Sequence, residues 1–209
     1  PVVLVLINGR PLSINWADKF VPAILEAWYP GSKGGIAVAD ILFGDYNPGG
    51  KLTVTFPKTV GQIPFNFPCK PSSQIDGGKN PGPDGNMSRA NGALYPFGYG
   101  LSYTTFEYSD LKISPAIITP NQKAYVTCKV TNTGKEYAGK EVVQVYVSAP
   151  EDALEKPYQE LKGYGKTLML APGISETVTV TIPTESLASY DEETASYILE
   201  PGDYIIRAG

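Results

Sequence analysis

The order of apolar and polar positions changes along the chain, and its first stretch is continuously apolar. Residues 2–7 read VVLVLI, and the turn pair Asn8-Gly9 follows. A short apolar run rich in β-branched residues is typical of a strand that is buried on both faces of a parallel sheet. The pattern therefore predicts a central parallel strand at residues 2–7.

The next stretch, VPAILEAWYPG, has the apolar spacing of a helix. Val21, Ile24, Leu25 and Trp28 recur at intervals that place them on one helical face. The Pro-Gly pair at residues 30–31 is a typical helix stop. We therefore predict a helix that carries Trp28.

A second helix is expected to begin near Gly35 and to run through IAVADILFG, with Ile36, Ala39 and Phe43 along one stripe. Turn residues follow in GDYNPGGKL, and TVTF reads as a short strand. The order strand, helix, helix, strand is typical of a layered α/β domain with parallel strands.

Periodicity disappears between about residues 57 and 93. This region includes PSSQIDGGKNPGPDGNMSRANG, which is rich in Gly, Pro, Asn and Ser and has almost no apolar anchor. The composition predicts a long loop. Loops of this length in compact domains tend to be functional or disordered.

From about Thr105 the apolar period becomes two. KAYVTCKVTNTG, EVVQVYVSAP and ETVTVTIP all alternate, and SYILEPGDYIIRAG is expected to form a hairpin around Pro201-Gly202. Short strands with frequent turn signals are typical of a β-sandwich. A Cys…Trp…Cys arrangement is absent, so a fibronectin III-like sandwich fits better than an antibody-type domain. We therefore predict a two-part α+β chain, with a partial α/β layered domain at 1–104 and an all-β sandwich at 105–209.

The composition excludes several classes of catalytic site, metal site and binding partner. The 209 residues contain no histidine, which excludes Ser–His–Asp and Cys–His pairs and histidine metal sites. Cys69 and Cys128 have no metal-like spacing, and the alternation around Cys128 predicts a buried strand thiol. The net charge of −4 does not suit nucleic acid or an anionic membrane, and no apolar run is long enough to span a bilayer. We expect no cofactor and no metal.

Two loop motifs and three groups of carboxylates could have either a functional or a structural role. GDYNPGGKL lacks the spacing of a phosphate loop, and DGNMS lacks the ligands of a calcium loop. Paired carboxylates can hydrolyse glycosides. The candidates are Asp40 with Asp45, Glu151 with Asp152, and the run Asp191–Glu193. None is flanked by the apolar shell that raises a carboxyl pKa for acid catalysis, so structural roles are favoured.

Aromatic residues concentrate in LYPFGYGLSYTTFEY, where glycines separate Tyr95, Phe97, Tyr99, Tyr103 and Phe106. Such a segment could be a sugar platform or a buried joint between the two parts. A sugar site would also use carboxylates or amides, and none lies between residues 94 and 106. We therefore expect a structural seam, with these rings buried against both parts and against the helix of Trp28.

Four blocks of sequence together resemble one enzyme family. VLVLINGRPLSINW, VPAILEAWYPGSKGGIAVADILFGDYNPGGKLTVTFPK, GQIP and LYPFGYGLSYTTFEYS occur in this order, followed by ELKGYGKTLMLAPGISETVTVTI. Over the whole chain they are similar to the C-terminal part of glycoside hydrolase family 3, of the β-glucosidase and β-xylosidase type. The resemblance implies the end of an α/β sandwich domain followed by a fibronectin III-like domain.

The resemblance also implies where catalysis resides. In this family a barrel carries an aspartate nucleophile and the α/β sandwich supplies a glutamate acid/base. No residue of this chain matches either position, so both are expected upstream. One departure concerns the loop before LYPFGYGLSY, where an Arg/Tyr-rich stretch is common and GNMSRANGA stands here, keeping only Arg89. Pocket-lining roles are therefore not transferred to this loop.

The function implied is that of a fragment of a retaining, exo-acting β-glycosidase, with β-glucosidase favoured, and the fragment itself inactive. Its expected partners are a glycoside or oligosaccharide substrate, met through the full-length enzyme, and the upstream barrel. The resemblance alone suggests a periplasmic or secreted location. Two alternatives remain open: a non-catalytic carbohydrate-binding or adhesion module, and a structural spacer.

Overall fold

The computed structural model describes residues 1–62, 65–70, 92–150 and 154–209. They divide into two compact units. Unit 1 contains the described residues of 1–46, 51–67 and 92–99, and unit 2 contains 47–50, 68–70 and the described residues of 100–209. Unit 1 combines helices with strands and unit 2 is made of strands, so the chain has the expected two-part α+β fold. The domain boundary between residues 104 and 105 stays a prediction.

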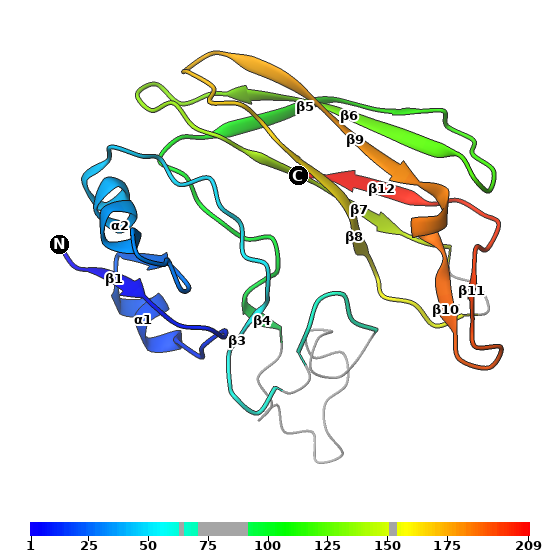
Figure 1. The fold of residues 1–209 in the computed structure, drawn as a ribbon, viewed down its shortest axis with the longest axis horizontal. Coiled ribbons are helices and arrows are strands. Elements are labelled where there is room, and N and C mark those ends of the chain that lie inside the picture. The colour runs from blue at the N-terminus through cyan, green and yellow to red at the C-terminus, as the bar shows by residue number, and fades with distance from the viewer. Residues whose placement is uncertain (63–64, 71–91, 151–153) are drawn as a thin grey trace. The chain divides into compact units, whose positions relative to one another are not determined.

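Unit 1 is organised around two parallel strands, β1 (Val3–Leu6) and β2 (Ala23–Glu26), which pair from Val3 opposite Ala23 to Leu6 opposite Glu26. The crossover between them contains the short helix α1 (Asn15–Phe20), which the sequence did not reveal (Figure 1). A parallel strand is confirmed within residues 2–7. Its predicted central, buried position is not, because in the described residues β1 pairs with β2 alone and Val2, Val3 and Ile7 are exposed.

The predicted helix carrying Trp28 is wrong, because β2 occupies its centre and Trp28 follows that strand. Its apolar residues fit either structure, since a short apolar run has no decisive period. Pairing with β1 gives this segment inter-strand hydrogen bonds, and the ladder continues past its end, where Ala27 N donates to Leu6 O at 2.9 Å.

The second helix is confirmed as α2 (Gly34–Phe43). It ends at Gly44, whose φ of 87° is the left-handed conformation common at helix ends. The strand expected in TVTF is reduced to β3 (Phe56–Pro57), which pairs antiparallel with β4 (Ala93–Tyr95). Of the long loop predicted at 57–93, residues 63–64 and 71–91 lie outside the described residues.

Unit 2 is a sandwich of two three-stranded antiparallel sheets (Figure 1). The first has the order β5-β6-β9, formed by Phe106–Ser114, Lys123–Asn132 and Ser175–Pro183. The second has the order β12-β7-β8, formed by Ile205–Ala208, Val142–Ser148 and Glu160–Lys166. The 3-10 helix η1 (Thr184–Leu187) follows β9.

Alternating side chains from the two sheets build the core of unit 2. The inward positions of β6, β7 and β9 are Val126, Cys128, Val130, Val143, Val145, Val147, Val178, Val180 and Ile182, all buried. Their period of two is the pattern that predicted these strands, and it is confirmed.

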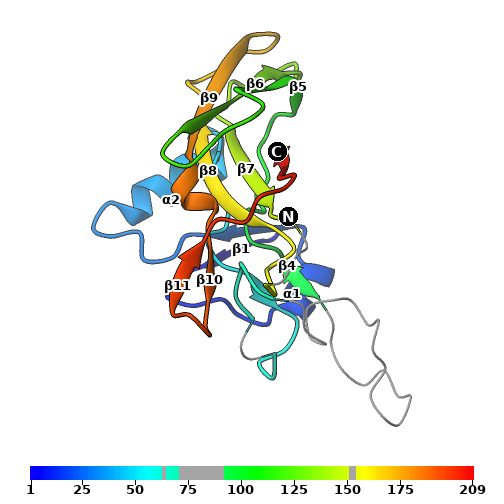
Figure 2. The same ribbon diagram turned by 90° about the vertical axis from the view of Figure 1, so that its right-hand side faces the viewer.

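The hairpin predicted around Pro201-Gly202 is wrong. β11 (Ser196–Ile198) pairs with β10 (Ser189–Asp191), as Figure 2 shows, and β12 crosses to the edge of β7 (Figure 1). Ile206 then lies opposite Val147 and packs against the core. Burial of apolar side chains in the sandwich therefore outweighs local pairing across the turn.

Two glycines in β8 allow the sheets to approach closely. A Cβ atom built on Gly163 would lie 2.5 Å from Val180 Cγ1, and one on Gly165 would lie 2.5 Å from Val178 Cγ1. Valine is stiff at χ1, so neither methyl group can swing away.

We expect Gly163→Ala to destabilise the sandwich by about 1–3 kcal/mol, the usual cost of overpacking a core. Urea denaturation followed by circular dichroism measures the change. Gly173→Ala is unsuitable as a control because its φ is 78°, whereas Thr177→Ala on the exposed face of β9 should be nearly neutral. Equal midpoints for Gly163→Ala and wild type would contradict the packing argument.

Candidate functional site

Polar and aromatic residues gather where β1 and β2 end. We call Asn8 and Gly9 after β1, together with Glu26, Trp28 and Tyr29 at and after β2, the carboxyl edge. The two strands are parallel, so these carboxyl ends lie at the same edge of the pair. In open α/β sheets, ligands bind outside the carboxyl ends of the strands.

The carboxylate of Glu26 links the two segments of the carboxyl edge. Its Oε2 accepts a hydrogen bond from Asn8 Nδ2 at 3.3 Å, and its Oε1 accepts one from the backbone N–H of Trp28 at 2.9 Å. Asn8 Nδ2 also donates to Arg10 O at 2.9 Å, which fixes the amide orientation.

Trp28 has a strained backbone. Its φ is 50°, in the left-handed region that bulky residues rarely adopt. The hydrogen bond from its N–H to Glu26 holds this conformation. Such outliers cost of order 1–3 kcal/mol and cluster at functional sites. The conformation of Trp28 therefore makes the carboxyl edge a candidate functional site.

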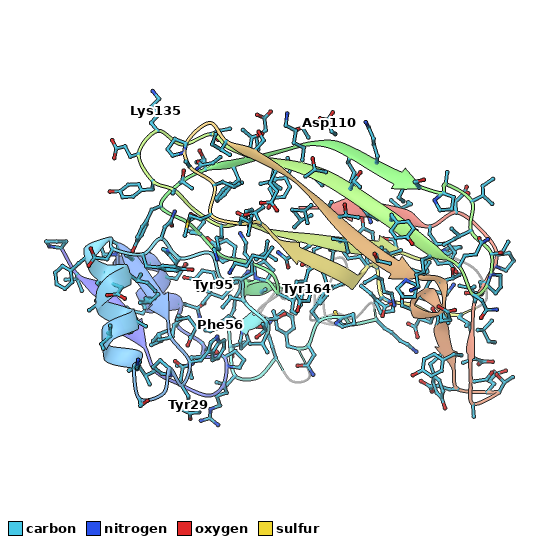
Figure 3. All side chains as sticks on the ribbon, turned by 45° about the horizontal axis from the view of Figure 1, so that its top comes forward. Tyr29, Phe56, Tyr95, Asp110, Lys135 and Tyr164 are labelled. Atoms are coloured by element: carbon cyan, nitrogen blue, oxygen red, sulfur yellow. The ribbon has the colours of Figure 1, made fainter. Side chains whose placement is uncertain are left out.

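A row of aromatic rings continues from Trp28 within unit 1. The Trp28 and Phe56 centroids are 5.9 Å apart, those of Phe56 and Tyr95 are 6.0 Å apart, and those of Tyr95 and Tyr99 are 5.4 Å apart. Figure 3 shows Phe56 and Tyr95 close together. Phe56 is only 1% exposed and is therefore the centre of this small core.

The hydroxyl of Tyr95 anchors one end of the row. It donates to Asp18 Oδ1 at 2.6 Å, which ties β4 to α1. Burial first, and then the neighbouring Asp18 carboxylate, raise the pKa of Tyr95 far above its usual range. Tyr95 is therefore a hydrogen-bond donor throughout the physiological range and not a proton-transfer group.

The six predicted seam residues do not all share one environment. Tyr95, Phe97, Tyr99 and Trp28 belong to unit 1, where Phe97 stacks on Phe67 at 4.6 Å. Tyr103 and Phe106 belong to unit 2, where Phe106 packs against the sandwich core.

Burial differs among the seam rings as well. Tyr95, Phe97, Phe106 and Trp28 are partly buried. The expectation of burial is wrong for Tyr99, which lies at the end of the aromatic row and is 39% exposed, and for Tyr103, which is 43% exposed. That these residues act as a joint stays a prediction.

The carboxylate pairs considered from the sequence find no catalytic setting among the described residues. Asp45 is exposed after α2, and residues 151–153, with Glu151 and Asp152, lie outside the described residues. Asp191 accepts hydrogen bonds from Thr194 Oγ1 at 2.5 Å and Glu193 N at 3.1 Å. These bonds lower its pKa, which is opposite to what a general acid needs.

Cys128 is the buried strand thiol that was predicted. It is 2% exposed, and its Sγ lies 3.6 Å from Ser109 O in hydrogen-bonding geometry. Burial raises the pKa of this thiol, which keeps it unreactive. In the described part of the chain, no three His, Cys, Asp or Glu side chains gather to hold a metal ion. Within the same part, none of the helices has the length and apolar character to span a bilayer.

Sequence reasoning missed two buried asparagines in unit 2. Asn47, from the NPGG turn, accepts hydrogen bonds from Ser102 Oγ and Tyr103 N at 2.9 and 2.8 Å and donates to Ala138 O at 3.0 Å. Asn132 organises the turn after β6 through four hydrogen bonds. An asparagine beside Pro-Gly or Thr-Gly was a visible signal, but it reads equally well as an exposed turn residue.

Truncating Phe56 should destabilise unit 1. We expect Phe56→Ala to lower the free energy of unfolding by about 3–5 kcal/mol, because it empties the space between Trp28 and Tyr95. Denaturant unfolding monitored by the fluorescence of Trp16 and Trp28, which both belong to unit 1, measures this. The matched control is Phe43→Ala, whose ring is 85% exposed. Equal losses in the two variants would refute the assignment of Phe56 as a core residue.

Comparison with known proteins finds a matching domain family in each unit. Residues 1–103 match the glycosyl hydrolase family 3 C-terminal domain, and residues 141–209 match a fibronectin type III-like domain. A periplasmic beta-glucosidase of Salmonella typhimurium is 44% identical over 100% of the chain, and a beta-xylosidase of Formosa agariphila is 42% identical over 100%. The chain spans 27% and 28% of these relatives, so it corresponds to about a quarter of their length.

Solved structures agree with the family match. A beta-glucosidase from Erythrobacter marinus superposes with a TM-score of 0.84 at 38% identity, covering 99% of this chain and 26% of that one. Beta-glucosidase 3B from Thermotoga neapolitana, in complex with α-D-glucose, gives 0.79 at 37% identity, covering 100% and 29%. The chain therefore belongs to glycosyl hydrolase family 3, of which it carries the C-terminal domain and the fibronectin type III-like domain.

Proposed function

We propose that the chain is the C-terminal part of a retaining, exo-acting β-glycosidase, and specifically of a β-glucosidase that releases terminal β-linked glucose. The full-length enzyme places an aspartate nucleophile and a glutamate acid/base on either side of the scissile bond. Both groups come from the polypeptide upstream of these residues, where the catalytic barrel is also expected.

The observation that carries the proposal is the match along the whole chain to relatives named as glycosidases. Both β-glucosidases and β-xylosidases occur among them. Glucose is favoured because the relative with 44% identity and both structures described above are named β-glucosidases. The name of the Salmonella relative also supports a periplasmic or secreted location.

The described residues support the assignment of catalysis to the upstream polypeptide. Hydrogen bonds from Thr194 and Glu193 lower the pKa of Asp191 and hold it ionised, and burial together with Asp18 raises the pKa of Tyr95 and holds it protonated. Neither is suited to move a proton during glycoside hydrolysis. Unit 1 and unit 2 are therefore assigned supporting roles, and the reacting carboxylates are assigned to the upstream polypeptide.

Hydrolysis by the full-length parent tests the proposal. We expect release of 4-nitrophenol from 4-nitrophenyl β-glucoside with a kcat/KM at least tenfold above that on the β-xyloside, about 1.4 kcal/mol of discrimination. A parent that cleaves neither glycoside would overturn the proposal. A parent that prefers the xyloside would retain the glycosidase assignment and overturn the choice of glucose.

A further inference from the structure

The carboxyl edge has features that the supporting role of unit 1 does not explain. It combines a strained tryptophan backbone, a carboxylate that joins two strand ends, and a tyrosine ring that is 77% exposed.

Gly9 makes room for the ring of Tyr29. A Cβ atom on Gly9 would lie 2.5 Å from Tyr29 Cε2 and 2.7 Å from its hydroxyl oxygen. The ring therefore rests on the backbone of the Asn8-Gly9 turn, next to the amide that bonds Glu26. Since the ring is 77% exposed, most of its surface is open to solvent, as its position at the outside of unit 1 in Figure 3 illustrates.

Acceptor oxygens with free lone pairs lie beside this ring. An ionised carboxylate offers about four lone-pair positions, and each oxygen of Glu26 accepts one hydrogen bond from the described residues. Asn8 Oδ1 is buried and accepts no hydrogen bond from the described residues. The remaining lone pairs of Glu26 therefore favour a ligand that is rich in donors and is not an anion, whereas Asn8 Oδ1 is too buried to contact it.

We propose that the carboxyl edge binds a saccharide unit of the glycoside substrate, with Tyr29 as the stacking ring and Glu26 as the acceptor for sugar hydroxyls. A pyranose presents C–H bonds on one face, which the negative face of an aromatic ring attracts, and hydroxyl donors around its rim. Glu26 also positions Tyr29, because it holds the strained backbone of Trp28, the residue directly before Tyr29. The inference rests on the proposed function, because it requires a glycoside substrate.

The test uses the full-length parent with cellobiose, a β-linked glucose disaccharide, as substrate. We expect Tyr29→Ala to raise KM about tenfold with kcat nearly unchanged, because a uniform binding contact is lost. Tyr29→Phe keeps the ring and should restore KM to within about twofold of wild type. Glu26→Gln should also raise KM about tenfold, since it removes the charge from the hydroxyl acceptor.

The matched control is Phe43→Ala, a truncation of an exposed ring in the same unit, and it should leave KM unchanged. Thermal unfolding of each variant separates binding from folding, because an exposed Tyr29 should change the melting temperature little.

Two outcomes would overturn the inference. KM for Tyr29→Ala could equal that of the wild type while the wild type hydrolyses cellobiose, which leaves the proposed function intact. A lower melting temperature of that variant would then show that the upstream polypeptide covers the edge. Tyr29→Phe could fail to restore KM. A wild-type parent that hydrolyses neither cellobiose nor 4-nitrophenyl β-glucoside would defeat the proposed function and the inference together.

Discussion

The isolated 209-residue chain is expected to show no measurable glycosidase turnover. General acid catalysis alone contributes about 10²–10⁴-fold, and the loss of the covalent intermediate removes a further large factor. We therefore expect the chain to be at least about 10⁴-fold slower than the full-length parent at equal molar concentration. Release of 4-nitrophenol from the aryl β-glucoside and β-xyloside, compared with a mock preparation, measures the difference.

The full-length parent, purified in parallel, is the positive control for that assay. Turnover by the isolated chain within a hundredfold of the parent would mean that these residues contain a catalytic pair. In that case the assignment of both reacting carboxylates to the upstream polypeptide would be wrong.

Replacing Asn132 by aspartate should destabilise the sandwich strongly. Asn132 is fully buried, and its Nδ2 donates to Tyr137 O at 2.9 Å and to Leu170 O at 2.8 Å. Aspartate has the same shape but no N–H groups, so a carboxylate would face two carbonyl oxygens. Adding the lost hydrogen bonds to the burial of an unpaired charge, we expect a loss of about 3–5 kcal/mol.

Aspartate would preserve only the acceptor side of Asn132. Its Oδ1 accepts hydrogen bonds from Thr104 Oγ1 at 2.6 Å and from Gly134 N at 3.0 Å, and aspartate would keep both. The control Asn121→Asp makes the same chemical change in an exposed turn, where the φ of 66° suits either residue. Chemical denaturation that gives both variants the same midpoint would contradict the role of Asn132.

The sandwich strands were predictable because one physical constraint dominates there. Val126, Cys128 and Val130 must point into the core, and a period of two is the solution that a strand offers. The end of helix α2 was predictable for a local reason, since Gly44 provides the left-handed residue that ends it, whereas the stripe residues Ile36 and Phe43 are exposed in the described residues.

The errors share a different cause, which is competition from residues distant in sequence. Ile24 and Leu25 fit one helical face, but β1 supplies a strand partner that the local pattern cannot reveal. Ile206 fits a local hairpin, but Val147 and the core behind it compete successfully for the segment. In each case tertiary pairing overrode a short-range signal.

The candidate site was less predictable than the fold. The density of aromatic residues marked Tyr95 and Trp28, and the structure joins them through Phe56, which no local pattern distinguished. Glu26 was invisible as a site residue because its role depends on the parallel pairing that brings Asn8 beside it. Chemistry that arises where two strands end requires the topology before the residues can be recognised.

The stereochemistry of hydrolysis by the full-length parent tests the central claim most directly. Proton NMR during the first minutes of 4-nitrophenyl β-glucoside cleavage distinguishes the newly formed anomers of glucose before they equilibrate. A retaining mechanism with an aspartate nucleophile predicts β-glucose as the first product. Initial formation of α-glucose, or no glucose at all, would contradict the assignment of the chain to a retaining β-glucosidase.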